Sequence, residues 1–107
     1  MSSAHFICKS GKGLSIVTKG SVIYRSRAWD IPVDDADRLV NGYIYFHETK
    51  AAPSYFGGKV TSYEIIEIDK AHSKRIEFTI TADIQAKGAS WEGRSDDMAW
   101  YSGVIES

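Results

Sequence analysis

The sequence predicts an α+β fold that is mainly β: a small twisted antiparallel sheet, curled into a partly closed barrel, with one short helix at about residues 34–41. Alternating and β-branched segments recur along the chain, whereas one segment has good helical spacing. With 107 residues, of which 43% are apolar, the chain suits a single domain over residues 1–107. So little helix cannot cover two sheet faces, and the sheet is therefore expected to curl.

Three strands are expected before the helix. The first lies at residues 5–8, and two shorter ones lie at 15–18 and 21–25, with Lys19 and Gly20 between them. Each is rich in β-branched or aromatic residues, which favour a pleated surface.

The helix at 34–41 has signals at both ends. Asp34 can cap the free backbone N–H groups of the first turn, where further carboxylates suit the helix dipole. Ala36 and Leu39 fall at helical spacing, and Asn41 followed by Gly42 can end the helix in the left-handed conformation.

The remaining strands follow the helix. A further strand is expected at 42–47. The strands at 60–68 and 75–84 should form an antiparallel pair joined by the polar connector 69–74. Apolar residues alternate strictly from Ile76 to Ile84, so this strand has one buried and one wet face. The tail from residue 88 is expected to be a long loop that leads to a final strand at 100–105.

The charge is unevenly distributed along the chain. The formal net charge is -1, yet residues 1–29 hold five basic residues and no acidic one. A patch of one sign can attract a polyanion even on a nearly neutral protein. The alternative is that folding disperses these charges over the surface.

Several functional classes have little support. The single cysteine, Cys8, excludes an intramolecular disulfide, and the spacing of the three histidines matches no zinc motif, so we expect no metal and no cofactor. His47 with Glu48 is more typical of a surface pair at a strand end than of an acid and base, and Asp96 with Asp97 of a solvated turn. No apolar run is long enough for a signal peptide or a membrane span, so a cytoplasmic protein without membrane contact is expected.

Binding chemistry is concentrated in the segment before the helix. Arg25 and Arg27 flank Trp29 in what is expected to be a loop. Guanidinium groups neutralise phosphates, and an indole can stack on a base. The alternative is that Trp29 closes one end of the barrel while the arginines pair with nearby aspartates.

A second loop, residues 49–59, adds Lys50 as a cation and Tyr55 as a stacking surface. Gly57 and Gly58 allow a close approach of the backbone or a positive φ. Tyr43 and Tyr45 alternate with Ile44 and Phe46, so they should face outward together, although Tyr55 could instead simply close the core.

Residues 23–68 resemble the centre of PUA-like domains, particularly the EVE and ASCH branches. The resemblance rests on a helix ending in Leu39-Val40-Asn41-Gly42, the strand Tyr43-Ile44-Tyr45-Phe46 and the Gly-Gly loop before Lys59-Val60-Thr61. The ASCH signature GxKxxE is not complete, because Ser62 stands where the glutamate belongs. The resemblance implies a barrel that binds RNA or a modified base in single-stranded or flipped form.

We therefore expect a small module that binds nucleic acid or a nucleotide and has no catalytic activity, with Arg25, Arg27 and Lys50 on phosphates and Trp29 and Tyr55 as stacking surfaces. The alternative is a protein-interaction module, such as a homodimeric accessory protein, whose interface would be formed by Trp91, Trp100 and Tyr101. A small enzyme that uses His47 or Asp97 is a third possibility.

Overall fold

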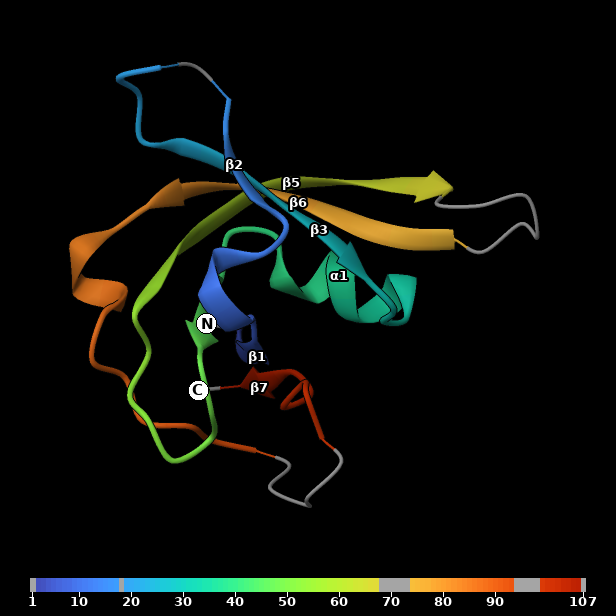
Figure 1. Cartoon of the computed structure of the whole chain (residues 1–107). Helices are drawn as coiled ribbons and strands as arrows, with labels where there is room; N and C mark the ends of the chain where they lie inside the picture. The colour runs from blue at the N-terminus through green and yellow to red at the C-terminus, as the bar shows by residue number, and fades with distance from the viewer. Residues whose placement is uncertain (1, 18, 68–73, 94–98, 107) are drawn as a thin grey trace.

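The structure is a computed structural model that describes residues 2–17, 19–67, 74–93 and 99–106. Within these residues, seven strands form one sheet and one α-helix packs beside it (Figure 1). The order across the sheet is β2-β3-β6-β5-β4-β1-β7. The bounds are β1 Ser2–Ile7, β2 Leu14–Ile16, β3 Ile23–Trp29, α1 Val33–Leu39, β4 Tyr43–His47, β5 Phe56–Glu67, β6 Lys74–Ala82 and β7 Ile105–Glu106, with short 3-10 turns η1 Lys9–Gly11 and η2 Ile84–Ala86.

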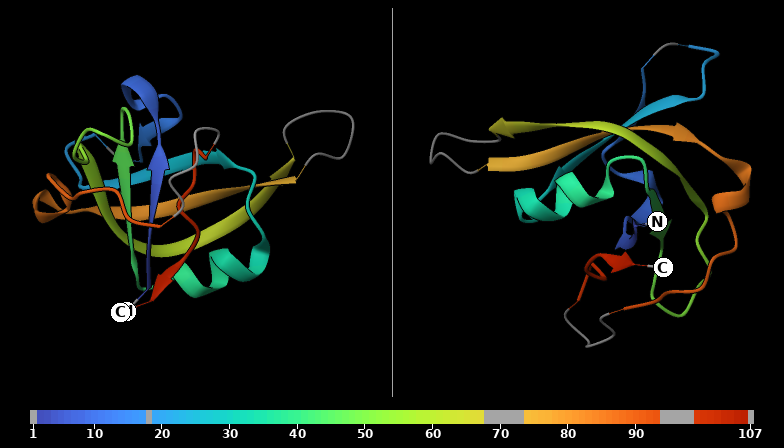
Figure 2. Two further views of the ribbon diagram at one scale, coloured as in Figure 1. Left: turned by 90° about the horizontal axis from the view of Figure 1, so that it is seen from below. Right: turned by 180° about the vertical axis from the view of Figure 1, so that it is seen from behind.

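The sheet is strongly curled. In the left view of Figure 2, β1 and β4 run steeply across the direction of β3 and β6, and the long bent strand β5 joins the two parts. The edge strands β2 and β7 are not paired with each other among the described residues. The mainly β fold with one short helix is therefore confirmed, whereas the sheet is open.

The expectation of a purely antiparallel sheet is wrong, because β1 pairs parallel to β4. Parallel neighbours need a long crossover, and here β2, β3 and α1 together supply it. The register pairs Ser3 with Tyr43 and His5 with Tyr45. The other strand pairs are antiparallel.

The hairpin of β5 and β6 is confirmed, although most of its expected connector, residues 69–74, lies outside the described residues. The register shifts between Val60 and Ser62. Gly57 and Gly58 make the close approach that their sequence predicts, since they are buried against the backbones of β4 and β6.

The helix begins and ends slightly earlier than expected. Its N-cap is Pro32, without a side-chain hydrogen bond, so Asp34 lies inside the first turn and does not cap it. Asn41 has φ +70°, which confirms the left-handed residue after the helix. Ala36 and Leu39 are fully buried, so one face of this short helix packs on the sheet.

The end of the chain forms less strand than expected. Of the stretch 100–105, Ile105 alone belongs to β7, whereas Tyr101 forms an isolated bridge with Phe6. Ile84 is 79% exposed in η2, so the alternation of β6 stops before it. The two residues of β7 pair with β1 at the other end of the chain. Periodicity along the sequence therefore does not indicate this strand.

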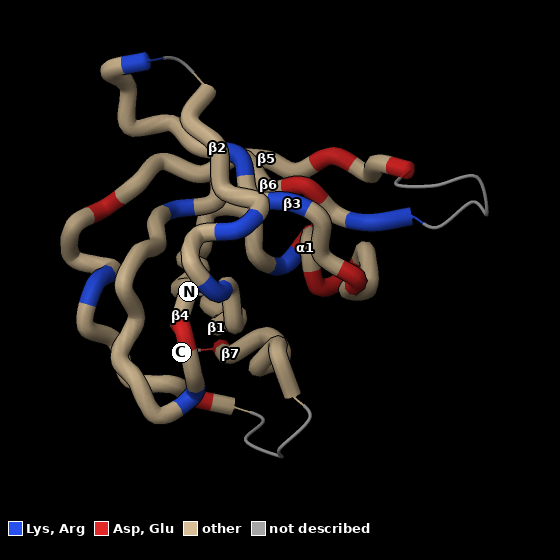
Figure 3. The backbone as a smooth tube through the Cα atoms, viewed as in Figure 1, with Lys and Arg blue, Asp and Glu red and all other residues tan. Residues whose placement is uncertain are grey.

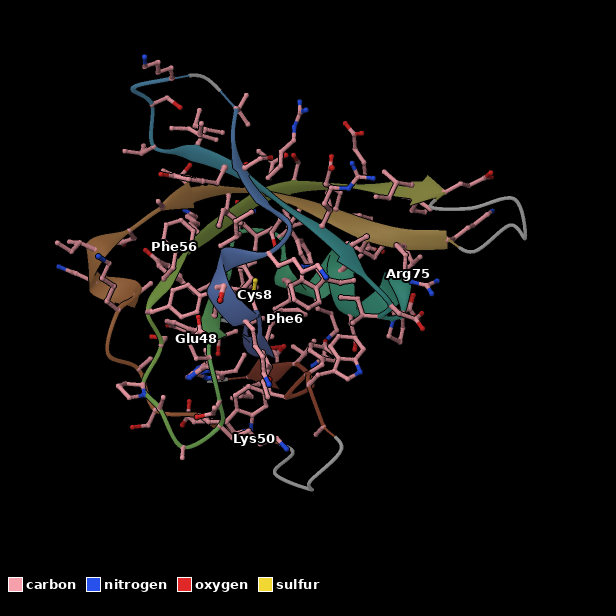
Figure 4. The ribbon with its side chains drawn as sticks, viewed as in Figure 1. Phe6, Cys8, Glu48, Lys50, Phe56 and Arg75 are labelled. Carbon is pink, nitrogen blue, oxygen red and sulfur yellow. The ribbon has the colours of Figure 1, made fainter. Side chains whose placement is uncertain are left out.

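The core lies inside the curl of the sheet. Three phenylalanines and several aliphatic side chains are fully buried there, namely Phe6, Phe46, Phe78, Leu39, Ile44, Val60 and Ile80. Figure 4 places Phe6 and Cys8 near the centre of the molecule. Among the described residues, no helix is both long and apolar enough to cross a membrane.

Replacing Gly58 by alanine should lower the free energy of unfolding by about 3 kcal/mol. A Cβ at this position would lie 2.2 Å from the carbonyl oxygen of Thr81, so a backbone would have to move. Urea denaturation measures the loss. The neighbouring Lys59→Ala is the control, because Lys59 is exposed and should change stability by less than about 0.5 kcal/mol. Equal effects of the two substitutions would show that the close approach is not needed.

Candidate functional site

Arg25, Arg27 and Trp29 lie on strand β3, so the expected loop is not formed. Both arginines are exposed on the outer face of the sheet, and Ser26 between them is buried. A register shift between Ser26 and Trp29 breaks the alternation and brings Trp29 opposite the buried Ile76. The strand therefore presents guanidinium groups outside and the indole inside.

Trp29 is held in a row of aromatic rings. Its ring lies 4.5 Å from that of Phe6, and it is nearly parallel to Phe46 and to Trp100, at centroid distances of 6.2 and 5.8 Å. Its Nε1 donates a hydrogen bond to Ser26 Oγ at 2.8 Å. Trp100 is 39% exposed, so it is the more accessible stacking surface of this pair.

Three cations gather beside this row. A cavity of about 510 Å³, which we call the basic cavity, is lined by side chains from β1, η1, the loop after η1 and β3: Ile7, Cys8, Lys9, Lys12, Arg27 and Trp29. Figure 3 shows Lys and Arg positions on these segments. Arg27 is partly neutralised, because its Nε lies 3.7 Å from Glu77 Oε2. Lys9 and Lys12 are exposed.

Tyr55 supports the wall of the basic cavity. Its hydroxyl donates to the Cys8 carbonyl and accepts a hydrogen bond from the Gly11 amide at 3.2 Å. Burial and the bond to Cys8 raise the pKa of Tyr55. Glu48 also accepts a bond from the Ser10 amide at 2.7 Å. The tyrosine thus holds the segment that carries Lys9 and Lys12, a role that the sequence does not suggest.

Lys50 lies apart from the other predicted cations. It is in the loop after β4, and Figure 4 shows it below Cys8 and away from Arg75. The structure therefore brings together Arg27 and Trp29 with Lys9 and Lys12, and it does not bring Lys50 or Tyr55 into the same lining.

A pair of buried histidines is the main feature that sequence reasoning missed. His5 Nδ1 and His47 Nε2 lie 2.7 Å apart, and His47 Nδ1 lies 2.9 Å from the Ala52 carbonyl oxygen. The two side chains are 1% and 0% exposed, so the expectation that His47 forms a surface pair with Glu48 is wrong. Burial, followed by the proximity of His47, lowers the pKa of His5 to about 4.

A second cavity, of about 370 Å³, opens beside this pair. We call it the histidine cavity, and its lining includes Ser3, His5, Tyr43, Tyr45, Ser90 and Glu92. The rings of His5 and Tyr45 are stacked at 4.8 Å. Tyr43 and Tyr45 thus share one face, as their alternation predicts.

The three expected interface residues lie on opposite sides of β1. The ring of Trp91 packs near those of His5 and His47, at 5.7 and 5.2 Å. Tyr101 stacks on Phe6 at 4.9 Å, and its hydroxyl donates to Asp35 at 2.9 Å. Trp100 adjoins Trp29, so the three rings do not form one continuous patch.

No group of three or more His, Cys, Asp or Glu side chains is placed to hold a metal ion within the described residues, and Asp96 and Asp97 lie outside them. Comparison of the chain with protein-family models, curated proteins and solved structures gives no match. The site is therefore defined by its own chemistry: a histidine cavity beside Ser3 and His5 of β1, and a basic cavity at the end of the same strand, beside Ile7.

The stability of the protein should fall as the pH drops from 6.5 towards 4. In this window the unfolded chain protonates His5, whereas the folded chain, with its lowered His5 pKa of about 4, excludes the proton. The free energy of unfolding is unaffected by His5 above pH 6.5, and the loss reaches about 3 kcal/mol below pH 4. Urea denaturation across this range measures it. His5→Gln should remove this part of the slope, and an unchanged slope would contradict the assignment.

Proposed function

We propose that the protein is a small nucleic-acid or nucleotide binding module without catalytic activity, and that the basic cavity is its phosphate-binding surface. The observation that carries this proposal is the gathering of Lys9, Lys12 and Arg27 around the edge of Trp29. Lys9 and Lys12 come from one stretch of the chain and Arg27 from β3, so the proximity of the lysines to Arg27 is a property of the fold.

Phosphate binding follows from the chemistry of these side chains. Two exposed ammonium groups and a half-exposed guanidinium can neutralise successive phosphates of a single strand. Arg25, on the same outer face of β3, extends the positive surface. Glu77 neutralises part of the charge of Arg27, so the lysines are expected to contribute more of the attraction.

Base stacking is the second part of the proposal. Trp100 is the exposed member of the row formed with Trp29 and Phe46, and a base could add to this row on the outer face of Trp100. Trp29 then acts as the support of the stack, while its partly buried edge borders the phosphates.

The PUA-like assignment is also a proposal. A curled sheet with one short helix that ends before β4 is compatible with such a barrel, and Asn41 supports the predicted helix end. Closure would need the edges β2 and β7 to approach each other. An interaction module that uses exposed Trp100 for self-association remains the rival, and size measurement in solution separates it from the binding module.

Short single-stranded RNA should bind in a salt-dependent way. With three phosphate contacts, the affinity should fall roughly twentyfold between 50 and 200 mM salt. Lys12→Gln should weaken binding to all sequences and reduce the magnitude of the salt slope by about 0.7. Fluorescence anisotropy of a labelled octanucleotide measures both quantities.

Arg75→Gln is the matched control for charge. Arg75 is on β6 and is not among the residues that line the basic cavity. This variant should retain the salt slope of the original protein. Absence of RNA binding at micromolar protein, or equal effects of the two variants, would overturn the proposed surface.

Trp100→Leu should weaken RNA binding by about 1–3 kcal/mol, the usual loss for one stacked base. Leucine retains an apolar side chain but lacks the flat ring. The same anisotropy titration gives the affinity. If the variant binds normally but changes the oligomeric state in analytical ultracentrifugation, Trp100 belongs to a self-association interface instead.

A further inference from the structure

One nitrogen of the histidine pair has no hydrogen-bond partner. His5 is 1% exposed, and its Nε2 is buried and unsatisfied within the described residues, although the side chain borders the histidine cavity. A buried polar atom without a partner is costly, so such an atom beside a cavity points to a missing ligand group.

The hydrogen-bond chain determines what this atom requires. The Ala52 carbonyl can only accept, so His47 Nδ1 carries a hydrogen. With both rings neutral, His47 Nε2 is then an acceptor and His5 Nδ1 must donate to it. The hydrogen of His5 is thus on Nδ1, which leaves a lone pair on Nε2. The cavity therefore needs a hydrogen-bond donor at this point.

A second acceptor stands opposite the first. Glu92 Oε2 lies 3.9 Å from His5 Nε2, and its side chain is 67% exposed at the cavity edge. This distance is too long for a direct hydrogen bond, and an unprotonated histidine nitrogen could not donate one. An amino group has two hydrogens and can serve both acceptors at once.

The walls favour a flat ligand. The ring of Tyr45 stacks on His5, and Tyr43 lies 6.3 Å from Tyr45 at an interplanar angle of 24°. Ser3 and Ser90 bring hydroxyl groups to the same cavity, and a hydroxyl can donate to a ring nitrogen. Burial, followed by the carboxylates of Glu92 and Asp83, raises the pKa of Tyr45, and these two negative groups are unfavourable for a phosphate.

We propose that the histidine cavity binds a planar heterocycle with an exocyclic amino group, an aminopyrimidine or aminopurine, whose amino group donates to His5 Nε2 and Glu92. The ring lies against Tyr45, and its acceptor nitrogen meets a serine hydroxyl. A guanidinium group could also donate to both acceptors, but it offers no acceptor to the serines and would fill little of a 370 Å³ cavity. This site is separate from the basic cavity and does not require phosphate.

Two pairs of nucleosides test the proposal. Uridine has a carbonyl oxygen where cytidine has an amino group, and inosine has a carbonyl oxygen where adenosine has an amino group. Titrations followed by ¹⁵N-resolved NMR at pH 7.5 should show cytidine or adenosine binding at least tenfold more tightly than its oxo partner, because a carbonyl oxygen would face two acceptors. Long-range ¹⁵N spectra should show the hydrogen of His5 on Nδ1.

Variants assign the effect to the two acceptors. Glu92→Gln, at an exposed position, introduces an N–H donor and should reduce the preference for the amino member of each pair at least threefold. His5→Phe keeps an aromatic ring against Tyr45 but removes one of the two acceptors, and should also reduce that preference at least threefold. Glu64→Gln, on the exposed face of β5 and outside the lining of both cavities, is the control and should leave the preference unchanged.

Three binding results would overturn the proposal: equal binding within each nucleoside pair, no binding of any of the four at millimolar concentration, or tighter binding of methylguanidine. A hydrogen on His5 Nε2 would also overturn it. Since nucleosides lack phosphate, these outcomes are independent of RNA binding by the basic cavity, which Lys12→Gln reports.

Discussion

The parallel pairing of β1 with β4 is the constraint on which the core and both cavities depend. One face of β1 contributes Phe6, whose ring is surrounded by those of the aromatic core, and the other contributes Ser3 and His5 to the histidine cavity. The end of the same strand, at Ile7, borders the basic cavity. Because side chains alternate along a strand, a shift of one residue in this register would exchange the two faces and remove the stacking of His5 on Tyr45.

The two cavities differ in their electrostatics. The basic cavity collects lysines from the N-terminal segment, whereas the histidine cavity is bordered by Glu92, and Asp83 accepts a hydrogen bond from Tyr43 at 2.8 Å. The formal net charge of -1 conceals this division. One small domain therefore has a basic cavity at the end of β1 and a cavity bordered by an acidic residue near the start of the same strand.

Features that depend on neighbouring residues were predictable. The strict alternation around Phe78 predicts β6 and its hairpin with β5, and the outward pair Tyr43 and Tyr45 follows from the same period of two. Features that depend on the register between strands could not be predicted from the sequence. The bulge that turns Trp29 inward replaces an expected loop, and Tyr55 binds the chain at Cys8, 47 residues away, instead of presenting a free ring.

The sequence alone determined the mainly β character, the short helix and the excess of positive charge before residue 30, because periodicity, capping and charge are local properties. The tertiary structure decided which of these residues meet. His5 and His47 are 42 positions apart, and only the parallel pairing of their strands brings His5 Nδ1 to 2.7 Å from His47 Nε2. Likewise, Lys12 reaches Arg27 because β2 and β3 pair and the Arg27 amide donates to the Gly13 carbonyl. Sites built across strands depend on long-range pairing, which leaves no periodic signal in a single chain.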